Sequence, residues 1–275
     1  MKYIFLLIPL FLVSQQGLGQ KNFTDEFKFK AVYKLTYQPD STDIEFVLSE
    51  PMVLYIGDKI SQFSSLGKAV GDSLKANKKR EKSVAAFQRL QAQIPKTKFD
   101  YSVIKLKPSE NIYFSERIAK DELIYEEDLQ LMDWEIKPET KEIANYKVQK
   151  ATTVFAGRKY TAWFSVEIPI TDGPYKFYGL PGLIIEVSDE KKDYQFQLTN
   201  FQKLEPSKDV SFDPKDHMVV DKDEFREIKR NYDRNPLAAL ERSGIKIQFS
   251  PQQEREAKKE LKEKFEKKNN PIELE

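Results

Sequence analysis

Apolar and polar side chains alternate along several short segments of the chain, which is the pattern of half-buried β-strands. Residues 27–37 follow it closely, because every second side chain is apolar and most of the intervening ones are lysines. Similar segments follow at short intervals: 44–56, 99–107, 111–118, 122–131, 146–154, 158–168, 183–187 and 194–204. Pro51 places a break or an edge position inside the second of them.

Short turns join these segments, so they predict an antiparallel sheet rather than β-α-β units. Ala156 and Gly157 mark a hairpin between 146–154 and 158–168, and residues 138–140 form a polar turn. Because one face of several strands is polar, we expect a strongly curved sheet or half-barrel. The predicted fold class is mainly β with helical additions, α+β.

Two regions change to a helical composition. Residues 61–93 are rich in lysine, alanine, glutamine and serine, and apolar positions within 81–93 fall at helical spacing. Beyond residue 216 we expect a charged helix at 221–232, a last strand at 245–249 and a charged helix at 252–268. Ion pairs four residues apart would stabilise the last helix, and we expect the final few residues to be frayed.

Residues 173–184, GPYKFYGLPGLI, combine glycines and prolines with apolar and aromatic side chains. Glycine permits backbone conformations or close approaches that other residues resist, and proline fixes its own φ. An ordinary solvated loop is not this apolar. We interpret the segment as a buried corner between the hairpin that carries Trp163 and the next strand; a ligand-binding loop is the alternative.

The first nineteen residues have the form of a secretory signal peptide. Lys2 precedes an apolar run at 4–13, and Gly17 and Gly19 stand before the expected cleavage point. The run is too short to cross a bilayer, which takes about 20 residues, and an uncleaved anchor or a buried strand is the alternative. We expect a signal peptide at 1–19, a single β-rich domain at 20–250, and a charged C-terminal helix and tail at 251–275.

The chain has no cysteine. This excludes disulfides, a thiol nucleophile, thiolate metal ligands and a lipid anchor on cysteine. The 45 basic and 44 acidic residues give a formal net charge of +1, which argues against a nucleic-acid partner. We expect an exported protein, periplasmic or extracellular, with no transmembrane segment after signal cleavage.

Catalytic chemistry is weakly indicated. His217 is the single histidine, so a His-Glu-x-x-His zinc site is excluded. Asp213, Asp216 and Asp221 near it do not have the spacing of an EF-hand, and we interpret them as loop and helix-capping residues. We therefore expect no metal and no cofactor. The acidic residues at 121–122 and 126–128 leave open a glycosidase-type carboxylate pair.

The candidate binding residues gather around the 173–184 segment. Trp163, Tyr175, Phe177 and Tyr178 are candidates for an aromatic platform for a sugar or lipid, although aromatic side chains in strands more often belong to the core. The full set of binding candidates, which a purely structural role would also explain, is Trp134, Trp163, Gly173, Pro174, Phe177, Tyr178, Gly179, Pro181 and Gly182.

Residues 179–184, Gly-Leu-Pro-Gly-Leu-Ile, resemble the hexapeptide that names the GLPGLI family of exported proteins from Bacteroidota-type bacteria. Trp134, 156–158, 162–164, 168–170 and 173–177 have the family's order and spacing. Roughly residues 130–190 carry the resemblance. The family often has a cysteine before the Lys-Ala pair of the hairpin, where this chain has Gln149, so a thiol role is not implied here.

The resemblance implies an envelope protein of undetermined function, with no catalytic residues to carry over. It also implies similarity to a bowl-like N-terminal domain of a bacterial glycoamidase. Our first hypothesis is a non-catalytic binding or accessory module that contacts a glycan, an apolar ligand or an outer-membrane receptor complex. The alternatives are a hydrolase that acts on glycans or peptides through Asp or Glu, and a purely structural partner of the receptor complex.

Overall fold

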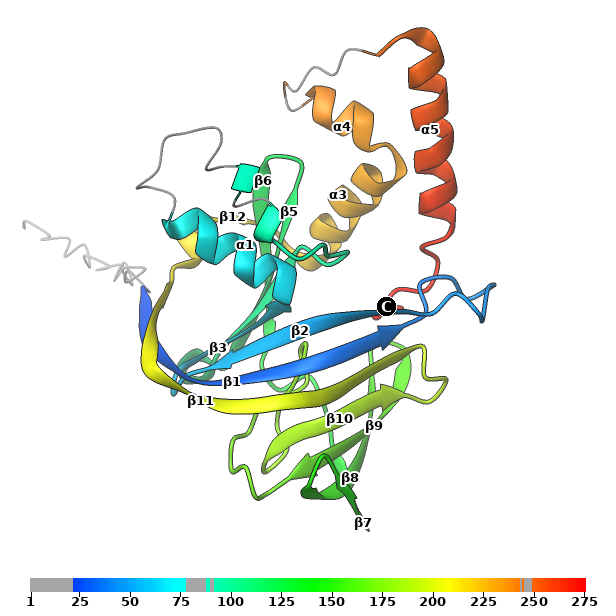
Figure 1. Ribbon diagram of the computed structural model, residues 1–275. Helices are drawn as coiled ribbons and strands as arrows, with labels where there is room; N and C mark the ends of the chain where they lie inside the picture. Colours follow the sequence, from blue (N-terminus) through cyan, green and yellow to red (C-terminus); the bar gives the residue numbers. More distant parts are fainter. Residues whose placement is uncertain (1–21, 78–87, 90–91, 243, 245–248) are drawn as a thin grey trace, which may run out of the picture.

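Twelve strands form one sheet in the computed structural model, which describes residues 22–77, 88–89, 92–242, 244 and 249–275 (Figure 1). The strands are β1 Phe23–Tyr37, β2 Leu48–Ile56, β3 Ile60–Ser65, β4 Tyr101–Leu106, β5 Asn111–Ile118, β6 Asp121–Asp128, β7 Glu135–Ile143, β8 Tyr146–Phe155, β9 Arg158–Ser165, β10 Leu183–Asp189, β11 Tyr194–Phe212 and β12 Met218–Val219. Their order is β12-β6-β5-β4-β3-β2-β1-β11-β10-β9-β8-β7. All neighbours are antiparallel except β12, which pairs with β6 in parallel.

Helices connect and follow the strands. They are α1 Leu66–Asn77, α3 Lys222–Arg234, α4 Pro236–Arg242 and α5 Pro251–Glu266, with 3-10 turns η2 Lys107–Ser109 and η3 Pro214–Asp216. In Figure 1 they stand on one side of the long β1, β2 and β11 strands, while β7–β10 lie on the other. Among the described residues, no helix is both long and apolar enough to span a membrane.

The two faces of β3–β6 pack against different parts of the chain. Val103, Phe114 and Tyr125 point to the inner face and join the main hydrophobic core. Ile104, Tyr113 and Ile124 alternate with them on the outer face and form a smaller core with Phe212 and others. This is the period-two pattern of strands, here with apolar residues on both faces. All six residues of β4 are therefore buried.

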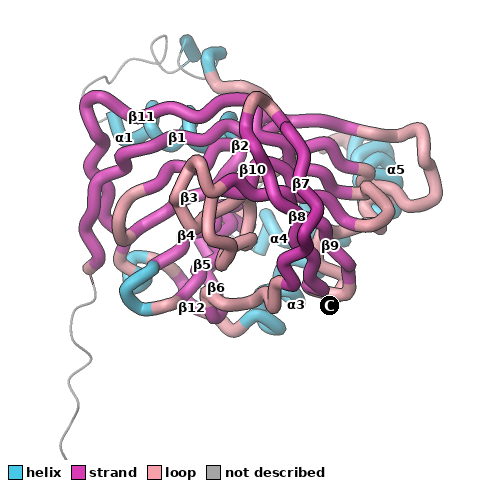
Figure 2. The backbone as a smooth tube through the Cα atoms, turned by 90° about the horizontal axis from the view of Figure 1, so that it is seen from below, coloured by secondary structure: helices cyan, strands magenta, loops and turns pink. Residues whose placement is uncertain are grey.

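The mainly β, antiparallel fold class with helical additions is confirmed. The strongly curved half-barrel is not: the sheet is open and not strongly curled, with β12 and β7 at its two ends. Seen from below, the loop that joins β9 to β10 lies between the two halves of the sheet (Figure 2). This loop supplies apolar cover for the inner face, so a tightly curled sheet is not needed to bury it.

Several local predictions are confirmed. The β8–β9 hairpin turns at Ala156 and Gly157, which both have positive φ. In β2, pairing with β3 begins only at Met52. Pro51 therefore has no β3 residue opposite it, and it occupies an edge position on that side, as predicted. Residues 61–65, by contrast, are strand rather than helix, and the helical insert begins at Leu66.

Other expectations differ from the structure or fall outside it. The polar turn at 138–140 is wrong, because Pro138 lies inside β7, an edge strand with a pairing irregularity there. Phe249 is not in a strand, and residues 245–248 lie outside the described residues. The signal peptide at 1–19 and most of the predicted helix at 81–93 also lie outside them.

Candidate functional site

Residues 173–184 lie between β9 and β10, against the inner face of the sheet. Tyr175, Lys176, Phe177 and Leu180 are almost completely buried, and Leu183 begins β10. The Tyr33 hydroxyl donates to the carbonyl of Ile184 at 2.8 Å. The segment is thus a packed part of the core, as the corner interpretation expects.

A buried ion pair fixes the start of this segment. The side chains of Lys105 on β4 and Asp172 are both 0% exposed. Lys105 Nζ donates to Asp172 Oδ1 at 2.8 Å and to the carbonyls of Gly173 and Phe177 at 2.7 and 3.0 Å. The Ser61 hydroxyl donates to the other oxygen of Asp172. Burial lowers the pKa of Lys105, and Asp172 opposes that shift. Three acceptors use all three N–H groups of the ammonium, so this pair holds the fold and leaves no donor for a ligand.

Two of the glycines have a geometric requirement. A Cβ on Gly182 would lie 2.2 Å from the backbone oxygen of Ser165, so no other residue fits without moving the backbone. Gly179 has a φ of +105°, a conformation that side chains strongly disfavour. A Cβ on Gly173 would contact the side chain of Ile184 rather than backbone.

The aromatic candidates do not form one exposed platform. Phe177 is buried in the core, and Trp134 packs against it with ring centroids 6.3 Å apart. Trp134 Nε1 also donates to the carbonyl of Tyr178 at 2.8 Å. Trp163 is on the opposite face of β9 from Phe164, with Lys141 Nζ 4.0 Å above its ring.

Tyr178 is partly exposed and borders a surface hollow. It lines a hollow of about 260 Å³ with Phe29, Ile56, Gly57, Asp58, Lys107, Pro169, Ile170 and Thr171. Pro174 is buried and Pro181 is exposed. The structure therefore groups Trp134, Phe177, Tyr178 and the glycines around the corner and separates Trp163 from them.

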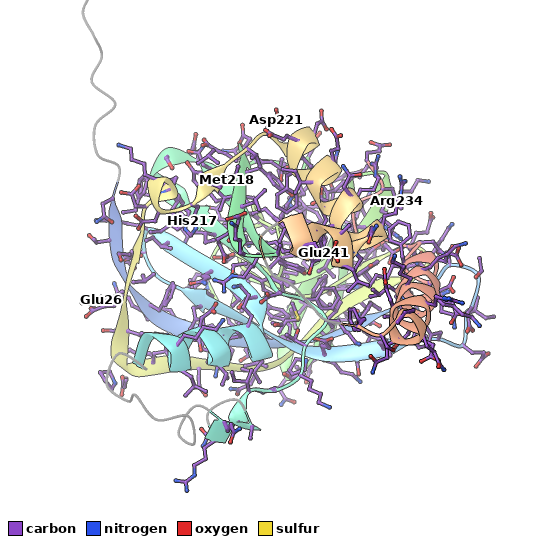
Figure 3. All side chains as sticks on the ribbon, turned by 90° about the horizontal axis from the view of Figure 1, so that it is seen from above. Glu26, His217, Met218, Asp221, Arg234 and Glu241 are labelled. Atoms are coloured by element: carbon purple, nitrogen blue, oxygen red, sulfur yellow. The ribbon has the colours of Figure 1, made fainter. Side chains whose placement is uncertain are left out.

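A second hollow, of about 180 Å³, lies on the outer face of the sheet beside α1. We call it the α1 pocket. Both polar and apolar residues line it: Ile60, Gln62, Lys68, Asp72, Ser102, Ile104, Ser115, Glu122, Val210, Ser211, Phe212 and His217. In the view from above, His217 and α1 stand on opposite sides of this face (Figure 3).

Charged groups gather around Lys68 in the α1 pocket. The Lys68 side chain is 7% exposed, and its Nζ is 3.0 Å from Asp72 and 3.9 Å from Glu122. The Ser115 hydroxyl donates to Glu122 at 2.7 Å, and Arg117 pairs with the same carboxylate at 3.2 Å. Burial favours the neutral form of Glu122, but Ser115, Lys68 and Arg117 outweigh it and hold its pKa below the usual value.

Two polar groups of the pocket have unused hydrogen-bonding capacity. Nδ1 of His217 is buried and has no partner among the described residues, and the ring stacks on Phe212 with centroids 5.6 Å apart. Ser102 lines the pocket and is 4% exposed, and no hydrogen bond joins its hydroxyl to the described part of the chain. Native proteins usually satisfy buried polar groups, so such groups in a hollow indicate a place for a ligand or water.

The residues that the structure describes contain no cluster of histidine and acidic side chains suited to a metal ion. Asp213 and Asp221 instead cap η3 and α3 by accepting backbone N–H groups at 2.9 and 2.7 Å. The capping interpretation of these aspartates is thereby confirmed.

The sequence around the corner matches a known family model. Residues 155–186 match the model described as "Protein of unknown function (Porph_ging)". The match runs from the β8–β9 turn to Glu186 in β10 and includes the Gly-Leu-Pro-Gly-Leu-Ile sequence. The matched part is thus the buried corner and the strands that flank it, and the α1 pocket lies outside it.

Solved structures of PNGF-II resemble the chain in fold. The structure in space group P21 has a TM-score of 0.50 and 10% identity, covering 74% of this chain and 33% of that chain. The structure in space group C2 has a TM-score of 0.49 and 10% identity, covering 74% and 32%. This chain spans about a third of the length of PNGF-II, and at this identity the likeness concerns the fold alone. None of the curated proteins matches the chain in sequence.

Sequence reasoning did not find the α1 pocket as a unit. In the sequence, Glu122 and His217 belong to separate segments, and no motif marks Lys68 or Ser102 as a site residue. The available signal was the presence of small polar residues inside buried strands, at Ser64, Ser102 and Ser115, which are successive neighbours across β3, β4 and β5. Only strand pairing brings these residues into one row.

Proposed function

We propose that this chain is a binding module of an exported bacterial envelope protein, and that the α1 pocket holds its ligand. The observation that carries this proposal is the buried Nδ1 of His217, which has no partner among the described residues. It lies in the same pocket as the hydroxyl of Ser102, which has no hydrogen bond to them either, and the nearly buried side chain of Lys68. The resemblance to exported envelope proteins supports the assignment of compartment.

The pocket fits a small ligand with several hydroxyl groups, such as one sugar unit of a glycan. Its volume of about 180 Å³ is below the ~300–1,000 Å³ of typical drug-sized ligand pockets. Ser102 on β4 and Lys68 on α1 offer donors, and Glu122 on β6 offers an acceptor. Phe212 contributes apolar surface to the lining. An apolar ligand would leave these polar groups desolvated and unpaired, which is costly.

A carboxylate hydrolase is the second candidate, because Asp72 and Glu122 line the same pocket. Glycosidase chemistry uses a pair of carboxyl groups, of which the acid has a raised pKa. Glu122 has a lowered pKa, and both carboxylates lie near Lys68. These features favour binding over acid catalysis.

Saturation-transfer NMR with glucose, galactose, mannose and N-acetylglucosamine tests the proposal. At least one sugar should bind the wild-type chain, and Ser102→Ala and Lys68→Met should weaken that binding at least tenfold. Ser64→Ala is the matched control, because Ser64 is a buried serine next to Ser102 on β3 that does not line the pocket. Absence of binding by all four sugars, or equal loss in Ser64→Ala, would contradict it.

Mass spectrometry of glycan and peptide mixtures incubated with the chain separates the two candidates. Binding without new products supports the module. Products that disappear in the double variant Asp72→Asn, Glu122→Gln would establish the hydrolase and overturn the non-catalytic assignment.

A further inference from the structure

The last seven residues do not fray but are held by side chains of the β1–β2 connection, β9, β11, the 173–184 corner and α3. We call this set of contacting residues the tail channel. Asn269 accepts from the backbone and hydroxyl of Ser41, both at 2.8 Å, and donates to Asp40 at 2.7 Å. Asn270 donates to the carbonyl of Gln38 at 2.9 Å and is 6% exposed. The expectation of a frayed end is therefore wrong, because polar side chains of the tail find partners in the β1–β2 connection.

Side-chain donors recognise the backbone of this tail. Arg158 donates to the side chain of Asn270 at 2.5 Å and to the carbonyl of Pro271 at 2.7 Å. The hydroxyls of Tyr194 and Tyr160 donate to the carbonyls of residues 270 and 272 at 2.7 and 3.2 Å. Donors aimed at successive carbonyls bind an extended peptide largely regardless of its sequence.

Glu273 enters a cationic pocket that gives the channel its chemical preference. Its carboxylate accepts from the Tyr175 hydroxyl at 2.6 Å and lies 2.5 Å from Lys176 and 3.0 Å from Lys222. Arg226 lies 3.6 Å away. Glu127 is the other carboxylate that pairs with both lysines, so among these five charged groups the cations are in excess without Glu273. Although burial opposes it, the cations lower the pKa of Glu273 to about 2.

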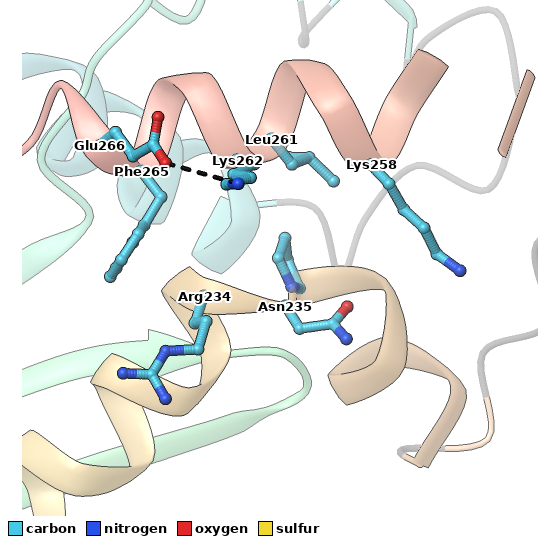
Figure 4. Close-up of a pocket in the computed structure, with 8 residues that line it drawn as sticks. Arg234, Asn235, Lys258, Leu261, Lys262, Phe265 and Glu266 are labelled. Atoms are coloured by element: carbon cyan, nitrogen blue, oxygen red, sulfur yellow. Dashed lines mark ion pairs between the residues drawn. The ribbon is translucent and has the colours of Figure 1, made fainter. Parts of the chain in front are cut away.

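The helix that carries the tail is attached more loosely than the tail itself. Most side chains of α5 are exposed. A cavity of about 440 Å³ separates α5 from the end of α3 and the start of α4 (Figure 4), with Leu261 and Phe265 on one side and Arg234 and Asn235 on the other. Residues 269–275 are thus tightly bound while α5, which joins them to the rest of the chain, is loosely packed. This is the arrangement expected of a ligand on a tether.

We propose that this channel is a peptide-binding site, occupied here by the chain's own residues 269–275. Its ligand is an extended acidic peptide with the Asn-Pro-x-Glu pattern of residues 270–273. The β1–β2 connection receives the residue before that pattern, Arg158 and the tyrosines hold the backbone, and Lys176, Lys222 and Arg226 receive the acidic side chain. The tether keeps the tail at an effective concentration on the order of millimolar, so it competes with any free peptide.

Fluorescence anisotropy with a labelled peptide of residues 267–275 tests this site. A chain that ends at residue 266 should bind the peptide saturably, and the full-length chain at least tenfold more weakly. A peptide with Glu273→Lys should bind at least tenfold more weakly than the native peptide. The proposal would be overturned if the truncated protein folds but does not bind the peptide, or if the truncated and full-length chains bind it equally well.

Matched variants of α3 separate specific recognition from general charge. Lys222→Met in the truncated chain should weaken peptide binding, because Lys222 contacts Glu273. Arg230→Met removes the same charge from an exposed position of the same helix and should leave binding unchanged. If both variants weaken peptide binding equally, the peptide is held by the general positive charge of α3 and not by a specific site, which would contradict the proposal.

A cleavable full-length chain covers the case in which the truncated chain does not fold. A protease site placed at residues 266–268 is cut after folding, and the labelled peptide is then added. The cut tail should exchange with the peptide within hours. A tail that never exchanges is an integral part of the fold, and the proposal then fails.

Light scattering of the full-length chain identifies the source of such a peptide. Dimers that dissociate on addition of excess peptide would indicate tails exchanged between copies. A monomer that binds the peptide after cleavage would indicate a segment of another protein. An aggregate unaffected by peptide and a cleaved chain that binds none would contradict the channel.

Discussion

The polar residues on the two faces of β3–β6 differ in how completely they are hydrogen-bonded within the chain. On the inner face, the ammonium of Lys105 meets three acceptors and Asp172 accepts from Lys105, Ser61 and the backbone of Gly173. On the outer face, neither the hydroxyl of Ser102 nor Nδ1 of His217 has a hydrogen-bond partner within the described part of the chain. Both sets lie in or beside buried strands, so burial alone does not distinguish them.

The difference separates residues that specify the fold from residues that can receive a ligand. A buried polar group with all its bonds made within the chain contributes to a unique packing and has no capacity left. A buried polar group with spare capacity beside a hollow lowers the stability of the empty protein, and a ligand can recover that loss. The corner at 173–184 belongs to the first kind and the α1 pocket to the second.

Breaking the inner ion pair should have the largest effect. Lys105→Met leaves the Asp172 carboxylate and the carbonyls of Gly173 and Phe177 buried without their cation, and loss of one partner of such a pair costs about 3–5 kcal/mol. Urea unfolding measures this free energy. Lys203→Met, which removes an exposed pair with Glu205, is the control and should hardly change the midpoint. A small loss in Lys105→Met would mean that the inner network does not hold the corner.

Gly182→Ala should come next, with a loss of about 3 kcal/mol or more, because the new Cβ would lie 2.2 Å from a backbone oxygen that cannot move freely. Gly71→Ala is the matched control. Gly71 lies inside α1, and a Cβ there would be 3.6 Å from the side chain of Ile94, an ordinary van der Waals contact. Alanine is also a better helix former than glycine by about 1 kcal/mol. Thermal unfolding of both variants checks this, and an unchanged melting temperature in Gly182→Ala would refute the corner interpretation.

The sequence predicted the strands and the corner because both depend on local patterns. The alternation in 101–106 placed Val103 and Ile104 on opposite faces, and the glycines marked the tight approach at 182. It did not reveal the role of Lys105, since a lysine in an alternating strand is ordinarily a solvent-facing residue. Its partner Asp172 is 67 residues away, and only the folded sheet brings them together. The α1 pocket and the tail channel depend on long-range pairing in the same way.

Acid should weaken the attachment of the tail at Glu273, which is held by Tyr175, Lys176, Lys222 and Arg226 beside Glu127. The pKa of Glu273 is about 2 in the folded chain against 4.5 ordinarily. A carboxyl with a lowered folded pKa stabilises the protein above its unfolded pKa, and this stabilisation disappears as the pH falls from about 4.5 to about 2. At about 1.4 kcal/mol per pKa unit, the contribution is roughly 3–4 kcal/mol at pH 7.

Glu273→Gln should therefore be less stable than the wild type at pH 7, and the two should converge toward pH 2. Urea unfolding at pH 7, 4 and 2.5 measures the difference. Glu266→Gln, on the exposed surface of α5, should show no such convergence. A constant difference at all three pH values would mean that the charge of Glu273 is not what fixes the tail.

The smallest and sharpest difference concerns two buried serines on adjacent strands. Ser61→Ala removes a hydrogen bond to the buried Asp172 and should cost about 1–3 kcal/mol. Ser102→Ala removes a hydroxyl without a partner in the described chain and should change stability by less than about 0.5 kcal/mol. Urea unfolding of both, without ligand, decides between them. If Ser102→Ala is as costly as Ser61→Ala, the outer hydroxyl already has a partner, and the α1 pocket loses the spare capacity from which its binding role was inferred.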